Sequence, residues 1–297
     1  MSNHAAQRRQ RLIGIALMCG ALACFAVLDT IAKYLGTHMD VLQVVWARYT
    51  SAIVLTLFIY NPISHPGLLR SGQPWVQFGR GWVLIGSTLF NFLALRWLQL
   101  DEALALAFMT PFFVAILSGP ILNEWIGWRR WSAIVVGFCG VLLITRPGFG
   151  GMHPAAFISI AAAVCYALYA ILTRIAARTD SNETSLFYGN LLGAAVMLPV
   201  IPFVWTPPES LFVTGLMIAT GILGSVGHFM LISGHRLAPA ALLSPFIYTQ
   251  LIWVIALGYL VFGQVPTLWT LAGASIVIAS GLYMLYRERV VRGSDEL

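Results

Sequence analysis

The chain has 297 residues, of which 59% are hydrophobic and only 9% are charged, and its formal net charge is +6. Soluble domains carry roughly 25% charged residues, so this composition excludes an ordinary globular protein. The positive charge does not indicate nucleic-acid binding, because the basic residues stand at the ends of apolar segments, where they set orientation in a membrane. Apolar stretches of about 20 residues recur along the sequence, which predicts an all-α, polytopic membrane protein.

Hydropathy predicts ten membrane-spanning helices, and no soluble domain remains between them. The first follows a basic segment, residues 1–11, and resembles a signal peptide. Its apolar run continues into Asp29 and Lys33, however, and many further spans follow, which favours a transmembrane helix. In chain order, the predicted spans cover residues 12–34, 41–60, 81–98, 102–122, 129–146, 154–176, 184–205, 211–235, 238–262 and 267–286.

The basic residues also predict how these helices are oriented. With the N-terminus in the cytoplasm, only Lys33, Arg96 and Arg146 fall on the outer side, and Arg48 lies within a span. We therefore expect a multi-pass protein of the cytoplasmic (inner) membrane with both termini in the cytoplasm. The arginines expected on the cytoplasmic side are Arg8, Arg9, Arg11, Arg70, Arg80, Arg129, Arg130, Arg174, Arg178, Arg236, Arg287, Arg289 and Arg292.

The two halves of the sequence correspond at a constant offset of 141 residues. One offset serves the first, third and fifth predicted helices of each half, which indicates a duplication. Each half has an odd number of spans, so the second must enter the membrane from the opposite side; such inverted repeats are typical of alternating-access transporters. We predict repeats at residues 12–147 and 153–287 and tails at 1–11 and 288–297. The matched pairs are Cys24 with Cys165, Phe25 with Tyr166, Lys33 with Arg174, Gly86 with Gly227, Trp128 with Trp269, and Gly140 with Gly281.

Two opposite charges lie at similar depths in the first two predicted helices. Asp29 and Arg48 would each offset the desolvation of the other, so we expect them to pair. Their counterparts in the second half are Ala170 and Gly189, so the pair breaks the repeat. Two alternatives stay open: a structural ion pair between helices, or a role in binding substrate or ion. Lys33, nearer the interface, is expected to extend its amine toward the headgroups.

Polar and aromatic groups in other predicted spans extend the candidate binding site. His228 lies midway along the eighth span and can titrate or donate a hydrogen bond to a ligand, although bonding to a backbone carbonyl is an equal alternative. Its counterpart in the third span, Ser87, lies one turn from Asn91. Tyr49, Tyr166 and Tyr169 can stack on a planar or cationic ligand, or simply pack against lipid and other helices.

Four stretches carry a resemblance to a known family: CFAVLDTIAKYLG, VVWARY, LNEWIGWRRWSAIVVGFCGVLLITRPG and LVFGQVPTLWTLAGASIVIASGLY. The chain resembles the drug/metabolite transporter superfamily, EamA type, over nearly its entire length. The resemblance implies two five-helix repeats around a central cavity lined by the fourth and ninth helices, with Thr110, Tyr248 and Gln250 as candidate binding residues. The first stretch is most similar to members that move S-adenosylmethionine, riboflavin or similar metabolites. The second repeat departs from the family in Gln264, where glutamate is frequent.

The favoured function is a secondary transporter for a small organic metabolite that is amino-acid-, S-adenosylmethionine- or riboflavin-like, driven by an ion or substrate gradient. The sequence contains no G-x-x-x-x-G-K-[ST] loop for ATP hydrolysis. A channel is the alternative, and an integral membrane enzyme is a weaker one, since no repeated polar filter, zinc motif or nucleophile elbow is present. We predict no metal or cofactor site, and either a monomer or a homodimer in the bilayer. The cysteines lie in apolar segments without a C-x-x-C pair: Cys19, Cys24, Cys139 and Cys165.

Overall fold

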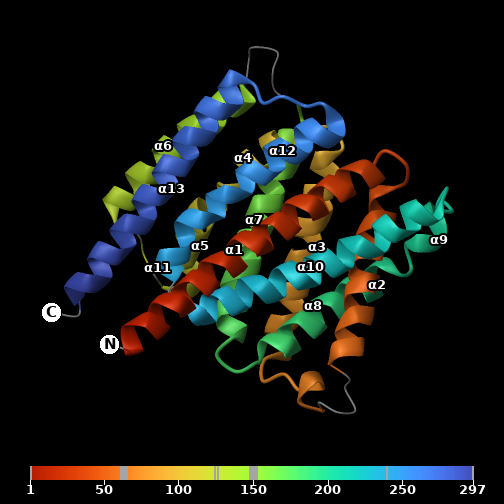
Figure 1. Cartoon of the computed structure of the whole chain (residues 1–297), viewed down its shortest axis with the longest axis horizontal. Coiled ribbons are helices and arrows are strands. Elements are labelled where there is room, and N and C mark those ends of the chain that lie inside the picture. Colours follow the sequence, from red (N-terminus) through yellow and green to blue (C-terminus); the bar gives the residue numbers. More distant parts are fainter. Residues whose placement is uncertain are drawn as a thin grey trace.

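The computed structural model describes residues 2–60, 66–123, 125, 127–146, 153–238 and 240–295. Within these ranges the chain forms helices and connecting segments without any β-strand, as hydropathy predicts (Figure 1). Residues 147–152, where the predicted repeats meet, lie outside the described ranges. The elements are α1 Ser2–Leu35, α2 Val41–Ile59, η1 Pro66–Leu69, α3 Pro74–Leu95, α4 Leu100–Ala107, α5 Thr110–Leu122, α6 Trp128–Thr145, α7 Ala155–Ala176, α8 Asn182–Met197, α9 Ile201–Val204, α10 Leu211–Leu237, α11 Ala240–Leu243, η2 Ser244–Thr249, α12 Gln250–Phe262 and α13 Leu268–Asp295.

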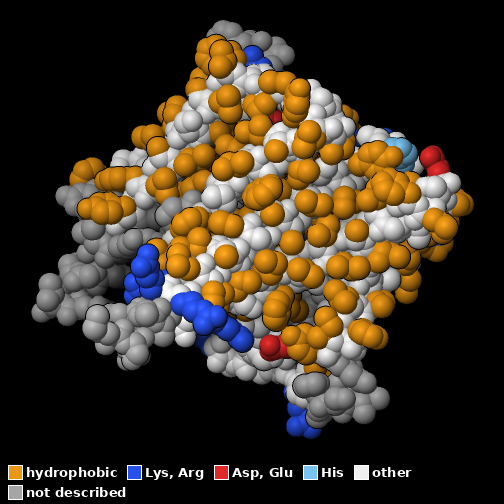
Figure 2. All heavy atoms as spheres, viewed as in Figure 1, with side chains coloured by type: hydrophobic (Ala, Val, Ile, Leu, Met, Phe, Trp, Pro, Cys, Tyr) orange, Lys and Arg blue, Asp and Glu red, His pale blue; other side chains and the backbone are white. Residues whose placement is uncertain are grey.

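The helices have the length and the surface of a multi-pass membrane protein. Among the described residues, six helices are long and apolar enough to cross a membrane, and three shorter apolar helices accompany them. Hydrophobic side chains cover most of the face in Figure 2, and the visible Lys and Arg side chains lie near its margins. Phe58, Phe203 and Leu211 are about nine-tenths exposed, as suits side chains in contact with lipid. The number of ten spans stays a prediction.

The helix contacts repeat between the two halves of the chain. α1 packs along α10, α3 packs along α7, and α6 packs along α13 (Figure 1). At the 141-residue offset, α1 corresponds to α7 and α3 corresponds to α10. The α1–α10 contact is therefore the counterpart of the α7–α3 contact. Gly227 in α10 faces the Phe25 ring in α1, and its counterpart Gly86 in α3 faces Cys165 in α7, beside the counterpart of Phe25. The duplication seen in the sequence is therefore also present in the packing.

Two of the predicted spans are broken near their prolines. The fourth span divides into α4 and α5 at Phe108 and Met109, two residues before Pro111 at the start of α5. The ninth divides into α11, a 3₁₀ segment η2 and α12. A proline removes a backbone donor and frees a carbonyl, which membrane helices tolerate where they line a cavity or contact polar neighbours. Phe108 corresponds to Thr249 at the 141-residue offset, so the two breaks fall at matching positions of the two halves.

Helix α3 begins earlier than hydropathy predicts. It starts at Pro74, whereas the predicted third span starts at residue 81. Proline at the first turn is favourable because its fixed φ suits a helix and its missing N–H would be unsatisfied there anyway. Arg80, which we expected on the cytoplasmic side of the membrane, therefore lies inside the helix and is only 2% exposed. Averaged hydropathy missed this turn because Gln77 and Arg80 are polar yet face other helices rather than lipid.

Lys33 does not extend toward the headgroups, contrary to the sequence-based expectation. Its side chain is buried, and its Nζ donates to the carbonyl oxygens of Leu95 at 2.7 Å and Leu98 at 2.6 Å. The last carbonyls of a helix have no partner within the helix and carry partial negative charge, so they attract a nearby cation. Lys33 thereby fixes the C-terminal end of α1 to the end of α3.

Asp180, between α7 and α8, connects the second half of the chain to the segment before α3. Its carboxylate accepts hydrogen bonds from Ser71 Oγ at 2.5 Å and from the backbone N–H of Gly72 at 2.7 Å. Gln77 Nε2 donates a third bond, also at 2.7 Å. These bonds favour the ionised carboxylate over the protonated acid.

We expect this junction to make the folded protein sensitive to acid. Burial alone would raise the pKa of Asp180, but the hydrogen bonds it accepts outweigh burial and lower its pKa. A lowered folded-state pKa means that the group stabilises the fold above its unfolded pKa and loses this effect as pH falls through the folded one. The melting temperature of the purified protein should therefore drop below about pH 4. Asp180→Asn should show a smaller drop, and Glu209→Gln, a change at an exposed acid, should melt like the parent; equal acid dependence in all three would contradict this role.

Candidate functional site

One cavity of about 420 Å³ lies between helices of both halves. Its walls come from α1, α2, α3, α4, α5, α7, α10, η2 and α12. This volume is within the range of about 300–1,000 Å³ typical of small-molecule sites. Most of the binding residues predicted from the sequence line it, and they are Asp29, Arg48, Asn91, Thr110, Tyr166, His228, Tyr248 and Gln250.

Asp29 contacts α3 rather than the arginine that we expected as its partner. Asn91 Nδ2 donates to Asp29 Oδ1 at 3.0 Å. Arg48 Nη1 instead donates to Thr88 Oγ1 at 2.5 Å, and the described residues contain no ion pair between Asp29 and Arg48. Asn91 and Thr88 lie one turn apart on α3, so this helix provides a neutral partner for each charge. Asp29 and Arg48 therefore both face the cavity but do not form an ion pair with each other.

Arg48 lies against aromatic rings and keeps one donor unused. Its guanidinium carbon lies 5.0 Å from the ring centre of Tyr49 and 6.0 Å from that of Phe92. Such cation–π contacts are favourable when the cation is shielded from water. Its Nε atom, by contrast, is buried without a hydrogen-bond partner. Arg48 is therefore held in place but incompletely satisfied.

Tyr49 and Tyr169 do not line the large cavity. Tyr49 is buried, and its hydroxyl contacts the Leu84 carbonyl at 3.1 Å and Thr88 Oγ1 at 2.9 Å. Its ring fills the space above Gly193, where a Cβ atom would overlap it. Tyr169 accepts a hydrogen bond from Arg80 Nη1 at 3.2 Å. Tyr49 thus orients the Arg48 partner Thr88, and Tyr169 belongs to a second, smaller cavity.

His228 is free to contact a ligand. It lines both cavities, and its ring lies edge-on to Phe25 with centres 5.1 Å apart. It forms no hydrogen bond to another described residue, so the alternative of a histidine satisfied by a backbone carbonyl is not what the structure shows. An imidazole can donate to or accept from a bound molecule.

The broken helices contribute the remaining predicted side chains. Thr110 begins α5, Tyr248 lies in η2, and Gln250 begins α12. The rings of Phe108 and Tyr248, one from each break, meet edge-on with centres 5.1 Å apart. The helix pair that the family resemblance implied does line the cavity.

Both halves of the chain match the model of the EamA-like transporter family, at residues 12–146 and 153–286. The chain belongs to the EamA-like transporter family. A relative named S-adenosylmethionine uptake transporter, from Rickettsia conorii, is 30% identical over 281 residues, which are 94% of each chain. Another, named riboflavin transporter, from Vibrio cholerae, is 27% identical over 274 residues, 91% of each chain.

A solved crystal structure shows the same fold at low sequence identity. It is 18% identical, has a TM-score of 0.64, and the match covers 96% of this chain and 99% of the other. The match covers both regions that the family model matches, so the two share one fold. The family and its named relatives identify a small-metabolite transporter rather than an enzyme, and nothing favours the channel alternative.

Sequence reasoning missed several polar residues of this EamA-like transporter. Thr88 and Ser159 line the large cavity, as does Ser87, which the sequence identified only as the counterpart of His228, and Arg80 and Ser225 line the small one. A signal for α3 was available in the spacing of its polar residues. Positions 77, 80, 84, 87 and 91 share one face of a helix, and only Leu84 among them is apolar, so with the adjacent Thr88 the polar residues form one stripe: Gln77, Arg80, Ser87, Thr88 and Asn91.

Proposed function

We propose that this EamA-like protein is a secondary transporter that moves an amino-acid-type metabolite, with S-adenosylmethionine as the leading candidate. The observation that carries the proposal is the carboxylate of Asp29 on the wall of a 420 Å³ cavity within the membrane-spanning region. An ionisable group at this depth is costly unless it has a function, and a carboxylate favours a cationic ligand. S-adenosylmethionine carries positive sulfonium and ammonium groups, and the named Rickettsia relative takes it up.

Alternating access is the mechanism that suits this arrangement. The cavity is bounded by helices from both halves, and the helix contacts exchange under the repeat offset. Inverted repeats that rock around a site at their interface can expose it to either side of a membrane in turn. We place the protein in the cytoplasmic membrane with both termini in the cytoplasm and its repeats at residues 12–147 and 153–287. Energy would come from a gradient of the substrate or of a coupling ion.

Riboflavin is the second candidate, because aromatic rings line the same cavity. Phe25, Tyr166 and Tyr248 all contribute to its wall. Planar ring systems stack on such side chains in apolar pockets. Riboflavin, however, has no positive charge for Asp29, which is why it ranks below S-adenosylmethionine.

Counterflow in proteoliposomes tests the proposal. Vesicles loaded with unlabelled S-adenosylmethionine or riboflavin would receive a trace of the same labelled compound outside, and protein-free vesicles would serve as control. We expect saturable, transiently concentrative uptake of labelled S-adenosylmethionine. Uptake that never saturates and carries an electrical current would support a channel instead. Absence of counterflow for both compounds in correctly folded protein would contradict the proposed function.

A further inference from the structure

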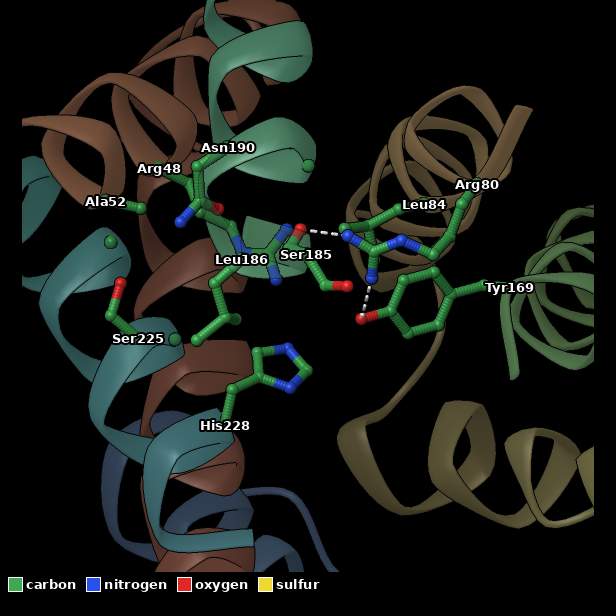
Figure 3. A pocket seen from close by; sticks show the side chains of 13 residues that line it. Arg48, Ala52, Arg80, Leu84, Tyr169, Ser185, Leu186, Asn190, Ser225 and His228 are labelled. Atoms are coloured by element: carbon green, nitrogen blue, oxygen red, sulfur yellow. Dashed lines mark hydrogen bonds between the residues drawn. The ribbon is translucent and has the colours of Figure 1, made fainter. Parts of the chain in front are cut away.

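A second cavity lies between α2, α3, α7, α8 and α10, next to the large one. It holds about 20 Å³, which is room for roughly one water-sized group. Arg48 and Arg80 both line it, and their head groups converge on the same space beside Ser185 and above His228 (Figure 3). Arg48 and His228 also line the large cavity, so the two spaces are neighbours that share a wall.

Arg80 is buried with neutral partners only. Its Nε donates to Gln77 Oε1 at 3.0 Å, and its two terminal nitrogens donate to the Tyr169 hydroxyl and the Ser185 carbonyl (Figure 3). No carboxylate of the described residues lies within ion-pair distance. Neutral acceptors satisfy N–H groups but leave the positive charge uncompensated, and a buried charge is expensive without an opposite one.

Arg48 adds a second positive charge and an unused donor to the same space. Its Nε is buried without a partner, and so is the Oγ of Ser225 on the cavity wall. Buried polar atoms without hydrogen bonds are rare in folded proteins and point to a missing partner. Two cations that share a cavity also repel each other. An anion between them would offset this repulsion and would accept a hydrogen bond from the unpartnered donors.

Neither arginine is repeated in the other half of the chain. At the repeat offset, Arg48 corresponds to Gly189 and Arg80 corresponds to Gly221. Each arginine contacts the glycine that stands in the place of the other: a Cβ atom at Gly189 would lie 3.4 Å from Arg80 Nη2, and Gly221 packs against the backbone of Arg48. Each half thus has one arginine where the other half has a glycine, and both exchanges place a guanidinium group at the small cavity.

We propose that Arg48 and Arg80 bind the carboxylate of the transported metabolite. This inference rests on the proposed function and names one end of the substrate. The small cavity admits a single oxygen-sized group, so the body of the molecule occupies the large cavity, where Asp29 faces its cationic part. Charge-assisted hydrogen bonds from guanidinium groups are among the strongest available to the carboxylate oxygen that enters the small cavity. The transporter would therefore prefer zwitterionic substrates of amino-acid type over uncharged or purely cationic ones.

The first test uses the unaltered protein and needs no substitution. Half-saturating concentrations for thermal stabilisation are compared for S-adenosylmethionine and for decarboxylated S-adenosylmethionine, which differ only in the carboxylate. We expect at least tenfold tighter binding of the carboxylated form. Equal binding of the two probes, or no binding of S-adenosylmethionine, would overturn the assignment. Riboflavin counterflow without any S-adenosylmethionine binding would overturn it while leaving transport of a small metabolite intact.

The second test assigns the preference to Arg80. Arg80→Gln should weaken binding of S-adenosylmethionine at least tenfold while changing that of the decarboxylated analogue less than twofold. Arg96→Gln, which removes an exposed positive charge at the end of the same helix, should leave both unchanged. If Arg80→Gln fails to fold, Arg48→Lys provides the same comparison, because lysine keeps the charge but loses the planar fork.

A free anion such as chloride could occupy the arginines in place of a substrate carboxylate. Uptake of S-adenosylmethionine would be measured with chloride replaced by methanesulfonate on both sides of the membrane. We expect unchanged rates. Loss of uptake that chloride restores would overturn the carboxylate assignment and identify the arginines as an inorganic anion site.

Discussion

Replacing Asp29 with asparagine is expected to lower the initial rate of S-adenosylmethionine transport at subsaturating concentration by about 30-fold or more. Losing one partner of a buried charged contact costs about 2–5 kcal/mol, and each 1.4 kcal/mol is a factor of ten. The fold should remain, because asparagine has the same shape and its carbonyl oxygen still accepts the bond that Asn91 donates to Asp29. Uptake into proteoliposomes measures the effect, and melting temperature and gel filtration report on the fold.

Asp40→Asn is the matched control for this experiment. Asp40 is exposed and precedes α2, where its carboxylate accepts a hydrogen bond from the Leu42 N–H at 2.8 Å. Asparagine is an equally good residue at a helix N-terminus, so the control loses the same charge without structural damage. If Asp29→Asn transports as fast as Asp40→Asn, Asp29 does not contact the substrate and its assignment is wrong.

Gly221→Ala is expected to lower the stability of the purified transporter by about 1–3 kcal/mol, the usual effect of overpacking. Gly221 in α10 crosses α2 so closely that an added Cβ atom would lie 2.6 Å from the backbone nitrogen of Ala52 and closer still to the carbonyl oxygen of Arg48. A clash with backbone cannot be relieved by a side-chain rotation, so the two helices must separate. Thermal unfolding in detergent measures the loss.

Gly215→Ala provides the control within the same helix. No atom lies within 4 Å of a Cβ atom placed at Gly215. Alanine is favoured over glycine in a helix by roughly 1 kcal/mol, so this variant should melt at the parent temperature or slightly above it. Similar melting temperatures for the two variants would show that α2 and α10 are not in close contact in solution.

Much of the architecture could be predicted from the sequence because lipid imposes a simple rule on it. Long apolar segments must be helices, and the offset that pairs Gly86 with Gly227 also governs how α3 and α10 pack. Polar residues within apolar segments predicted the cavity wall for a related reason. A group such as Asp29 or His228 is tolerated there only if it faces the protein interior.

The individual contacts could not be predicted in the same way. Hydropathy gives the depth of a residue but not its direction around the helix, so Asp29 and Arg48 could be placed level with each other without revealing that α3 supplies both partners. The predicted position of Lys33 at the headgroups was wrong because its partners are backbone carbonyls. Every residue has a carbonyl, so the sequence does not mark these partners. Arg80 was missed because hydropathy averaged over a window gives the same value for a polar residue packed against other helices as for one exposed to water.

The position of Lys33 has a practical consequence for following the transport cycle. It is the only lysine in the sequence, and its amine is enclosed by two carbonyls at the end of α3. We expect an acylating reagent to reach this nitrogen only when the C-terminal ends of α1 and α3 move apart. The extent of modification at this one side chain, measured by mass spectrometry, therefore counts the molecules that are open on that side, and the unaltered protein carries its own reporter of conformation.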